Sequence, residues 1–230
     1  MPVAQIPTVL AWLYTIGLFA LLDLRWLSLR NFKIIGVTGP TGAGKSTITA
    51  YLKNKGCYII DADALARQAL QKGSDCLVQV CAVFGDDILN SDGTLNRQLL
   101  AKKAFSTPEN TQRLNKITPP WIFMQVIKII DDIRKSNSNP VILFDAPVLF
   151  ESKMDILCDY VLAVVAPLEI RKERIMKRDS ITAENADIRI NAQHKDEFYI
   201  SRSEFSIDGS LSLEDIYNQA DKMLDSIIRG

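Results

Sequence analysis

The residues with the clearest chemical potential form a glycine-rich loop, Gly39-Pro-Thr-Gly-Ala-Gly-Lys-Ser46, with Thr47 directly after it. The loop matches G-x-x-x-x-G-K-[ST] at every fixed position. Glycines let the backbone fold around an anion, so that successive N–H groups point at phosphate oxygens. In such a loop the lysine reaches the β- and γ-phosphates of a nucleotide, and the hydroxyl after it binds Mg²⁺. We therefore predict a nucleotide site, with Ser46 as a magnesium ligand, formed by Gly39, Thr41, Gly42, Ala43, Gly44, Lys45, Ser46 and Thr47.

Acidic residues follow two of the apolar runs of the chain. Asp61 and Asp63 end the stretch "IIDAD", and Asp145 ends "VILFD". The carboxyl ends of parallel strands share one edge of a sheet, where ligands bind, so these acids are expected beside the phosphate loop. Asp63 there could accept the proton of an attacking hydroxyl, and Asp145 could hold Mg²⁺ through water. The alternatives are helix caps for Asp61 and Asp63, and a turn residue for Asp145.

Basic residues that could hold an anionic acceptor or the transferred phosphoryl group stand at three places. Arg67 and Arg97 are separate, whereas one stretch carries a cluster: Arg171, Lys172, Arg174, Lys177 and Arg178. For any single member, a solvated helix face is the alternative. The cluster follows the fourth predicted strand, where kinases with this loop carry a mobile lid that brings arginines to the phosphates. Arg178, near the end of the basic helix, is best placed for that movement.

The elements that must position these residues are predicted from hydrophobic patterning. An apolar strand over 32–38, a helix over 45–56 and an apolar strand over 57–60 make a βαβ unit, which implies a parallel sheet. Two further apolar runs bounded by prolines, 140–147 and 159–167, are typical of central parallel strands. The stretch 203–208 is expected to form an edge strand.

The remaining segments have helical periodicity. Residues 64–139 are expected to be mostly helical, with Thr107 as the N-cap of one helix and Pro108 at its first position. A basic helix is predicted over 168–179 and a single polar helix over 182–202. The chain is expected to close with a helix capped by Ser212.

Composition limits the classes of partner. The 230 residues include 27 basic and 27 acidic side chains, and this zero balance argues against nucleic acid as the main partner. The four cysteines have no C-x-x-C spacing and His194 is the single histidine, which argues against a zinc site. We read the cysteines as reduced, mostly buried thiols of an intracellular protein, and expect a cytoplasmic location.

The first 31 residues are treated as an apolar extension ahead of a domain over 32–230. No residue from Pro2 to Leu22 is charged, and the basic residues that follow would keep the domain on the cytoplasmic side if the segment entered a membrane. Membrane association through residues 1–22 is therefore one expectation. The alternatives are an apolar helix packed on the domain or a partner, or an upstream stretch outside the native start.

Together these stretches resemble the dephospho-coenzyme A kinase family. The resemblance covers about Lys33 to Ser210 and is carried by several segments at once: "GCYIIDADALAR", "FGDDILNSDGTLNRQLLAKKAFSTPENTQRLNKIT", "DAPVLFE", and "RIMKRDSIT" with "RINAQ". It implies a three-layer α/β P-loop kinase fold with a parallel sheet. A helical substrate-binding region, residues 64–139, would be inserted after the second strand, and a lid, residues 168–202, would follow the fourth.

The resemblance also implies a reaction and its residues. ATP with Mg²⁺ would phosphorylate the ribose 3′-hydroxyl of dephospho-coenzyme A. Asp63 would be the catalytic base, Lys45 would stabilise the phosphates, and Arg174 and Arg178 would act from the lid. Arg67 and Arg97 would bind the acceptor.

Two positions depart from the family pattern. Pro119 stands where the family usually has a histidine, and Gly209 stands where it has an asparagine near the nucleotide base. Neither departure removes a residue that handles phosphate, so a working enzyme is expected. The open alternatives are a P-loop kinase for another small hydroxyl or nucleotide acceptor, or a membrane-tethered nucleotide-binding protein without kinase activity. No N-K-x-D guanine-reading motif is present.

Overall fold

The computed structural model describes residues 31–137 and 139–229. The chain divides into two units, Met1–Asn31 and Phe32–Gly230. The membrane prediction for residues 1–22 lies outside the described residues. Within the described ranges, no helix combines the length and apolar character needed to cross a bilayer.

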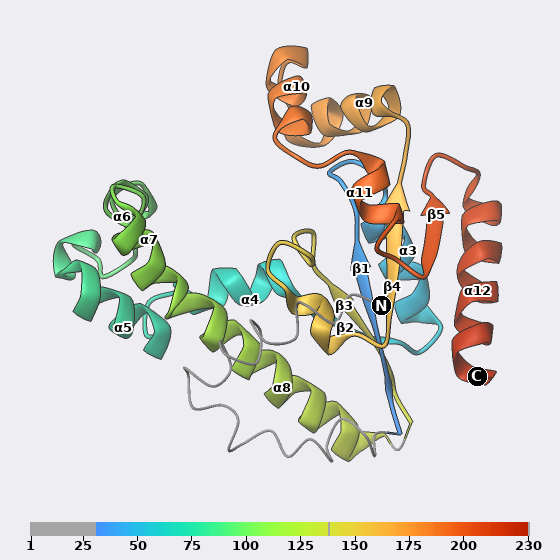
Figure 1. Cartoon of the computed structure of the whole chain (residues 1–230), viewed down its shortest axis with the longest axis horizontal. Helices are drawn as coiled ribbons and strands as arrows, with labels where there is room; N and C mark the ends of the chain where they lie inside the picture. The colour runs from blue at the N-terminus through green and yellow to red at the C-terminus, as the bar shows by residue number, and fades with distance from the viewer. Residues whose placement is uncertain (1–30, 138, 230) are drawn as a thin grey trace. The chain divides into compact units, whose positions relative to one another are not determined.

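Five parallel strands form the sheet, in the order β2-β3-β1-β4-β5 (Figure 1). Their bounds are Lys33–Thr38 (β1), Tyr58–Asp61 (β2), Val141–Asp145 (β3), Tyr160–Val165 (β4) and Phe205–Asp208 (β5). All five lie within the segments predicted to be strands or extend them by one residue, and β5 is an edge strand as expected. The α/β prediction with a parallel sheet is confirmed.

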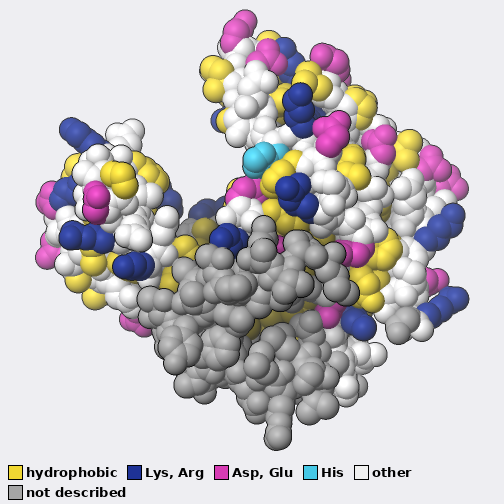
Figure 2. Space-filling model, in the orientation of Figure 1, with side chains coloured by type: hydrophobic (Ala, Val, Ile, Leu, Met, Phe, Trp, Pro, Cys, Tyr) yellow, Lys and Arg dark blue, Asp and Glu magenta, His cyan; other side chains and the backbone are white. Residues whose placement is uncertain are grey.

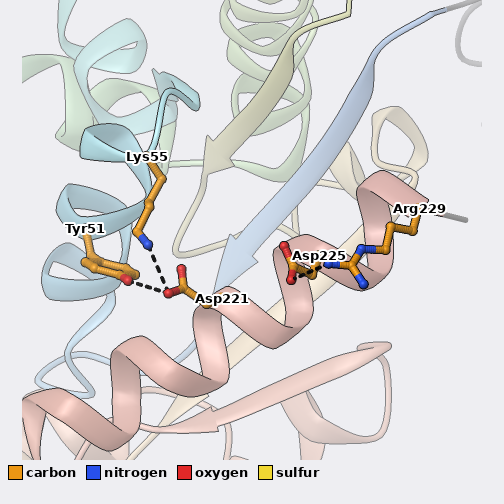
Figure 3. Close-up of polar contacts among 5 residues, drawn as sticks. All are labelled: Tyr51, Lys55, Asp221, Asp225 and Arg229. Carbon is orange, nitrogen blue, oxygen red and sulfur yellow. Dashed lines mark hydrogen bonds and ion pairs between the residues drawn. The ribbon is translucent and has the colours of Figure 1, made fainter.

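Helices α3 (Lys45–Asn54) and α12 (Leu213–Arg229) pack on one face of the sheet. Alternate strand residues such as Ile35 and Val37 join both helices in a buried core. On the outside, Tyr51 of α3 and Lys55, the residue that follows this helix, both donate hydrogen bonds to the Asp221 carboxylate of α12, at 2.8 and 3.0 Å (Figure 3). The Tyr51 ring also stacks on Tyr217. Ser212 caps α12 as predicted, since its hydroxyl accepts from Asp215 N–H.

Residues 62–136 are largely helical, as predicted for this region. The helices are α4 (Ala62–Ala69), α5 (Asp75–Phe84), α6 (Arg97–Ala104), α7 (Pro108–Asn115) and α8 (Thr118–Ser136). Helices α4 and α8 contact β3 and β2, whereas α5, α6 and α7 extend from the sheet as a helical arm, residues 75–115 (Figure 1). The arm has its own small core, which includes Leu77, Val80 and Leu100. Thr107 caps α7 as predicted.

Helices α9 (Leu168–Asp179), α10 (Ala183–Asn191) and α11 (Asp196–Ile200) follow β4 and occupy residues 168–202, the segment for which a lid is predicted and which we call the lid region. The prediction of a single helix over 182–202 is wrong, because a turn separates α10, which ends at Asn191, from α11, which begins at Asp196. Acidic residues after the break, Asp196 and Glu197, stand in the first turn of α11. Acids favour a helix N-terminus, so they support a new start there.

Candidate active site

A cleft of about 610 Å³ opens at the carboxyl ends of β1, β2 and β3. It is lined by the phosphate loop, by the acids that follow β2 and β3, and by two lid arginines. Figure 2 shows the surface hollowed between the helical arm and the lid helices. This is the edge at which ligands bind in open α/β sheets. The structure therefore brings most of the predicted site residues to one place.

The phosphate loop is held in a shape that needs glycine. At Gly39, φ is +136°, and a Cβ there would stand 2.0 Å from the Val164 carbonyl oxygen of β4. The loop runs into α3 at Gly44, and no side chain caps that helix. The uncapped N–H groups of a helix N-terminus attract anions, which suits the loop for phosphate.

Lys45, the first residue of α3, places its ammonium in the same loop. Its Nζ donates a hydrogen bond to the Gly39 carbonyl at 2.7 Å. Burial lowers the pKa of Lys45, and Arg178 lowers it further, whereas Asp145 and Asp63 oppose this change. The ammonium therefore stands between the acids of the cleft and the lid.

Asp61 and Asp63 have different environments although they are two residues apart. Asp61 is the N-cap of α4, where its Oδ1 accepts a hydrogen bond from Ala64 N–H at 2.8 Å. Asp63 stands in the first turn of α4, lines the cleft, and has no hydrogen-bond partner among the described residues. Asp61 is therefore a helix cap, whereas Asp63 is not. The Asp63 carboxylate lines the cleft without a hydrogen-bond partner among the described residues.

Asp145 lies at the end of β3, in register with Asp61 at the end of β2. Its Oδ1 is buried and has no hydrogen-bond partner among the described residues. Burial raises the pKa of Asp145 to about 6, with Asp61 and Asp63 adding to the rise and Lys45 opposing it. A buried, unsatisfied carboxylate oxygen beside a phosphate loop suits a cation and its water shell.

The residues present fit a Mg²⁺ ion that is held jointly by the protein and the substrate phosphates, and not by protein side chains alone. In the described part of the chain, no three His, Cys, Asp or Glu side chains are grouped closely enough to hold a metal. Magnesium in phosphoryl-transfer sites is commonly held by one or two protein oxygens together with substrate phosphates and water. Ser46 and Asp145, which both line the cleft, are of that kind.

The two lid arginines are held differently. Arg174 donates to the carbonyls of Gly42 and Ala43 in the loop, at 3.2 and 3.3 Å, and to Gly209 after β5 at 2.8 Å. In this structure it braces the loop. Arg178 pairs instead with the neighbouring Asp179 through two hydrogen bonds of 2.8 and 2.9 Å.

A third basic residue shares the carboxylate that holds Arg178. Arg189 of α10 also pairs with Asp179. The Arg178 side chain is more exposed than that of Asp179. Asp179 is paired with Arg189 across the α9–α10 junction as well as with Arg178. Because a second cation holds Asp179, Arg178 can leave it without stranding an unpaired acid.

The remaining predicted residues divide into those inside and outside the cleft. Arg67 lines it and stands 3.8 Å from Asp61. Arg97 begins α6 on the helical arm, is exposed, and is not among the residues that line the cleft. One residue that sequence reasoning missed, Gln193, lines the cleft. It is the last residue of the segment "RINAQ", so the family resemblance was the signal that could have found it.

The four cysteines agree with their prediction as thiols. All four are thiols; Cys57, Cys76 and Cys81 are buried and Cys158 is partly buried. Burial raises the pKa of Cys57 and of Cys76 to about 11.

The fold and the cleft define a P-loop kinase, a class that transfers a nucleotide's phosphoryl group. The family model for dephospho-CoA kinase matches residues 33–215. A dephospho-CoA kinase of Fusobacterium nucleatum is 34% identical over 197 residues, covering 86% of this chain and 100% of that protein. One of Corynebacterium diphtheriae is 40% identical over 178 residues, covering 77% and 88%.

Solved structures share the fold. The Thermus thermophilus protein TT1252 superposes with a TM-score of 0.71 at 30% identity, covering 86% of this chain and 98% of that one. A dephospho-CoA kinase of Campylobacter jejuni has the same fold, with a TM-score of 0.55. The chain belongs to the dephospho-CoA kinase family.

Proposed function

We propose that this protein transfers the γ-phosphoryl group of ATP to the ribose 3′-hydroxyl of dephospho-coenzyme A, with Asp63 as the general base. The observation that carries this proposal is the placement of the unengaged Asp63 carboxylate in one cleft with Lys45 and the phosphate loop. A base must stand near both the acceptor hydroxyl and the transferred group. Family membership supports the acceptor.

The phosphate loop holds the nucleotide, and the Lys45 ammonium exchanges the Gly39 carbonyl for phosphate oxygens. Ser46 and Asp145 would hold Mg²⁺, Ser46 through its hydroxyl group and Asp145 through water at its unsatisfied oxygen. When bound, Mg²⁺ neutralises charge on the phosphates. Asp145 must be ionised for this role; in the metal-free cleft its raised pKa places the ionisation near pH 6, and a bound cation would lower that pKa.

Lid closure brings Arg178 to the phosphates. The guanidinium leaves Asp179, which Arg189 continues to hold. A charged donor that is present only in the closed site stabilises the transition state more than the ground state. Arg174 contributes mainly by holding the loop in shape, because all its hydrogen bonds go to backbone carbonyls.

The acceptor is placed by residues on the other side of the cleft. Arg67 lines the cleft, and Arg97 on the helical arm reaches the acceptor if the arm and the sheet approach each other. Pro119 stands in the first turn of α8, a position that tolerates proline because N–H groups there have no intrahelical partner. Its ring offers no hydrogen bond to the acceptor.

The deciding experiment incubates the full-length protein with ATP, Mg²⁺ and dephospho-coenzyme A and follows coenzyme A by mass. We expect Asp63→Asn to lower kcat by on the order of a hundredfold or more, the usual scale for loss of a general base. Affinity for ADP should stay within about threefold, since the carboxylate is not a phosphate ligand. Asp75→Asn, an exposed acid at the start of α5, is the matched control. Near-normal turnover by Asp63→Asn would rule out the assigned base.

A further inference from the structure

Gln193 reaches the phosphate loop from the lid side of the molecule. It lies between α10 and α11, and its backbone N–H donates to the Ile190 carbonyl at 3.1 Å, which shapes the turn. Its side-chain Oε1 accepts a hydrogen bond from Thr41 N–H at 2.8 Å. The contact joins residues 152 positions apart, so it depends on the fold.

The direction of the Gln193 amide follows from the chemistry of this contact. A backbone N–H can only donate, so the side-chain carbonyl must face Thr41 and the NH₂ group must face away. Among the described residues, that NH₂ group has no hydrogen-bond partner. The cleft that Gln193 lines also contains Lys45, Asp63 and Arg178. Two unused N–H donors therefore stand beside the phosphate loop.

The segment that carries Gln193 is anchored by aromatic contacts. His194 stacks on Phe198 with ring centroids 3.7 Å apart, and Phe150, in the segment after β3, meets Phe198 edge-on at 5.8 Å. The Arg202 guanidinium lies 4.1 Å from the Phe198 ring centroid. A side chain on a fixed segment loses less conformational freedom when it binds a ligand. Helix α11, which follows Gln193, also contacts β4, so Gln193 stands at the anchored end of the lid region, and the movement proposed for Arg178 belongs to α9 and α10.

We propose that Gln193 contacts the γ-phosphoryl group of ATP through its NH₂ group while its carbonyl holds the loop at Thr41. The Lys45 ammonium is bonded to Gly39, two residues from Thr41, so the cation and the amide are anchored on the same short stretch of loop. Preorganised donors of this kind stabilise the charge of a transferring phosphoryl group. The inference rests on the proposed function and adds a residue that distinguishes ATP from ADP.

Two substitutions separate this role from a merely structural one. Gln193→Glu keeps an oxygen for Thr41 N–H, removes both donors and adds a negative charge toward the phosphates. We expect it to weaken binding of the non-hydrolysable β,γ-methylene analogue of ATP by about tenfold or more and to lower kcat on the order of a hundredfold. Affinity for ADP should change by less than about threefold. Gln193→Ala should also weaken binding of the ATP analogue and lower kcat more than it affects ADP affinity, but by smaller factors.

Asn191→Asp is the control, because it adds the same charge to the exposed end of α10 outside the cleft. Both affinities should then stay within about threefold, since an exposed charge is screened. The binding titrations need no acceptor, so they report on Gln193 even if wild-type protein fails to make coenzyme A. Gln193→Glu with wild-type affinity and turnover would overturn the inference. Equal losses of ATP-analogue and ADP affinity in Gln193→Ala would also overturn it, in favour of a structural role.

Discussion

At the residue scale, Asp145 combines a raised pKa with an unsatisfied oxygen, and the two properties predict opposite effects on stability and activity. Burial favours the neutral carboxyl group, and its pKa is about 6 in the folded protein. The ordinary value is about 3.9. The folded state therefore binds this proton more tightly than the unfolded state. For the metal-free protein, the Asp145 contribution to stability is full below about pH 4 and is lost as pH rises through about 6.

Asp145→Asn mimics the neutral form at every pH. We expect it to raise the free energy of unfolding of the metal-free protein at pH 7 by about 1 to 2 kcal/mol, with little change at pH 4. Urea unfolding in the presence of a chelator measures both values. The same variant should lose most of its turnover at saturating Mg²⁺, because an amide does not replace the carboxylate beside the ion. An unchanged or lower stability at pH 7 would contradict the assigned pKa.

At the element scale, the β5–α12 junction packs directly against the phosphate loop. A Cβ on Gly209 would stand 2.0 Å from the Ala43 carbonyl oxygen. That oxygen is a backbone atom of the phosphate loop, so it could not move aside as a flexible side chain could. Gly209 also donates its N–H to the Val165 carbonyl, at 2.8 Å, and accepts from Arg174. Gly209, which stands where the family has an asparagine, thus lies so close to the Ala43 carbonyl that this backbone arrangement has no room for a side chain.

Gly209→Ala should separate the junction from the loop and weaken the Arg174 brace. We expect a loss of about 1 to 3 kcal/mol in the free energy of unfolding, the usual range for overpacking, and weaker binding of ATP and ADP alike. Thermal unfolding and calorimetric titration with each nucleotide measure the two effects. Ser206→Ala, on the exposed side of β5, should leave both unchanged. Wild-type affinity in Gly209→Ala would show that the loop tolerates the displacement.

At the scale of the whole molecule, the described residues include three separate buried cores: one between the sheet and α3 and α12, one within the helical arm, and a small one between α9 and α10. Nucleotide binding depends on the first, because the loop joins β1 to α3. Acceptor binding is proposed to depend on the second. A substitution that destabilises the arm core should therefore weaken binding of dephospho-coenzyme A and leave nucleotide binding unchanged.

Leu100→Ala tests this division, because Leu100 is a buried member of the arm core. We expect a destabilisation of about 2 to 5 kcal/mol, as for other buried leucines, with a higher KM for dephospho-coenzyme A. Affinity for ADP should be unchanged below the unfolding temperature. Steady-state kinetics and nucleotide titration give the two quantities, and Lys102→Ala on the exposed face of α6 is the control. An equal loss of nucleotide affinity would indicate one continuous core.

The sequence alone was enough for the features that depend on neighbours along the chain. Hydrophobic runs and turn residues identify the strands and most helix ends, and cap chemistry locates the starts at Thr107 and Ser212. The phosphate loop is readable because its glycines, lysine and serine act within eight consecutive residues. The carboxyl ends of parallel strands must share an edge, so the meeting of Asp61 and Asp145 also follows from pattern.

Tertiary structure decided the features that join distant segments. Packing brings Gln193 to Thr41 and commits Arg174 to backbone carbonyls of the loop and the β5–α12 junction. It also leaves an Asp145 oxygen buried and unpaired, and it divides the predicted helix over 182–202 into α10 and α11. Side-chain partners and burial are set by which surfaces meet when the sheet, arm and lid pack together. Local composition records the tendency of each segment, but not the surface that it will meet.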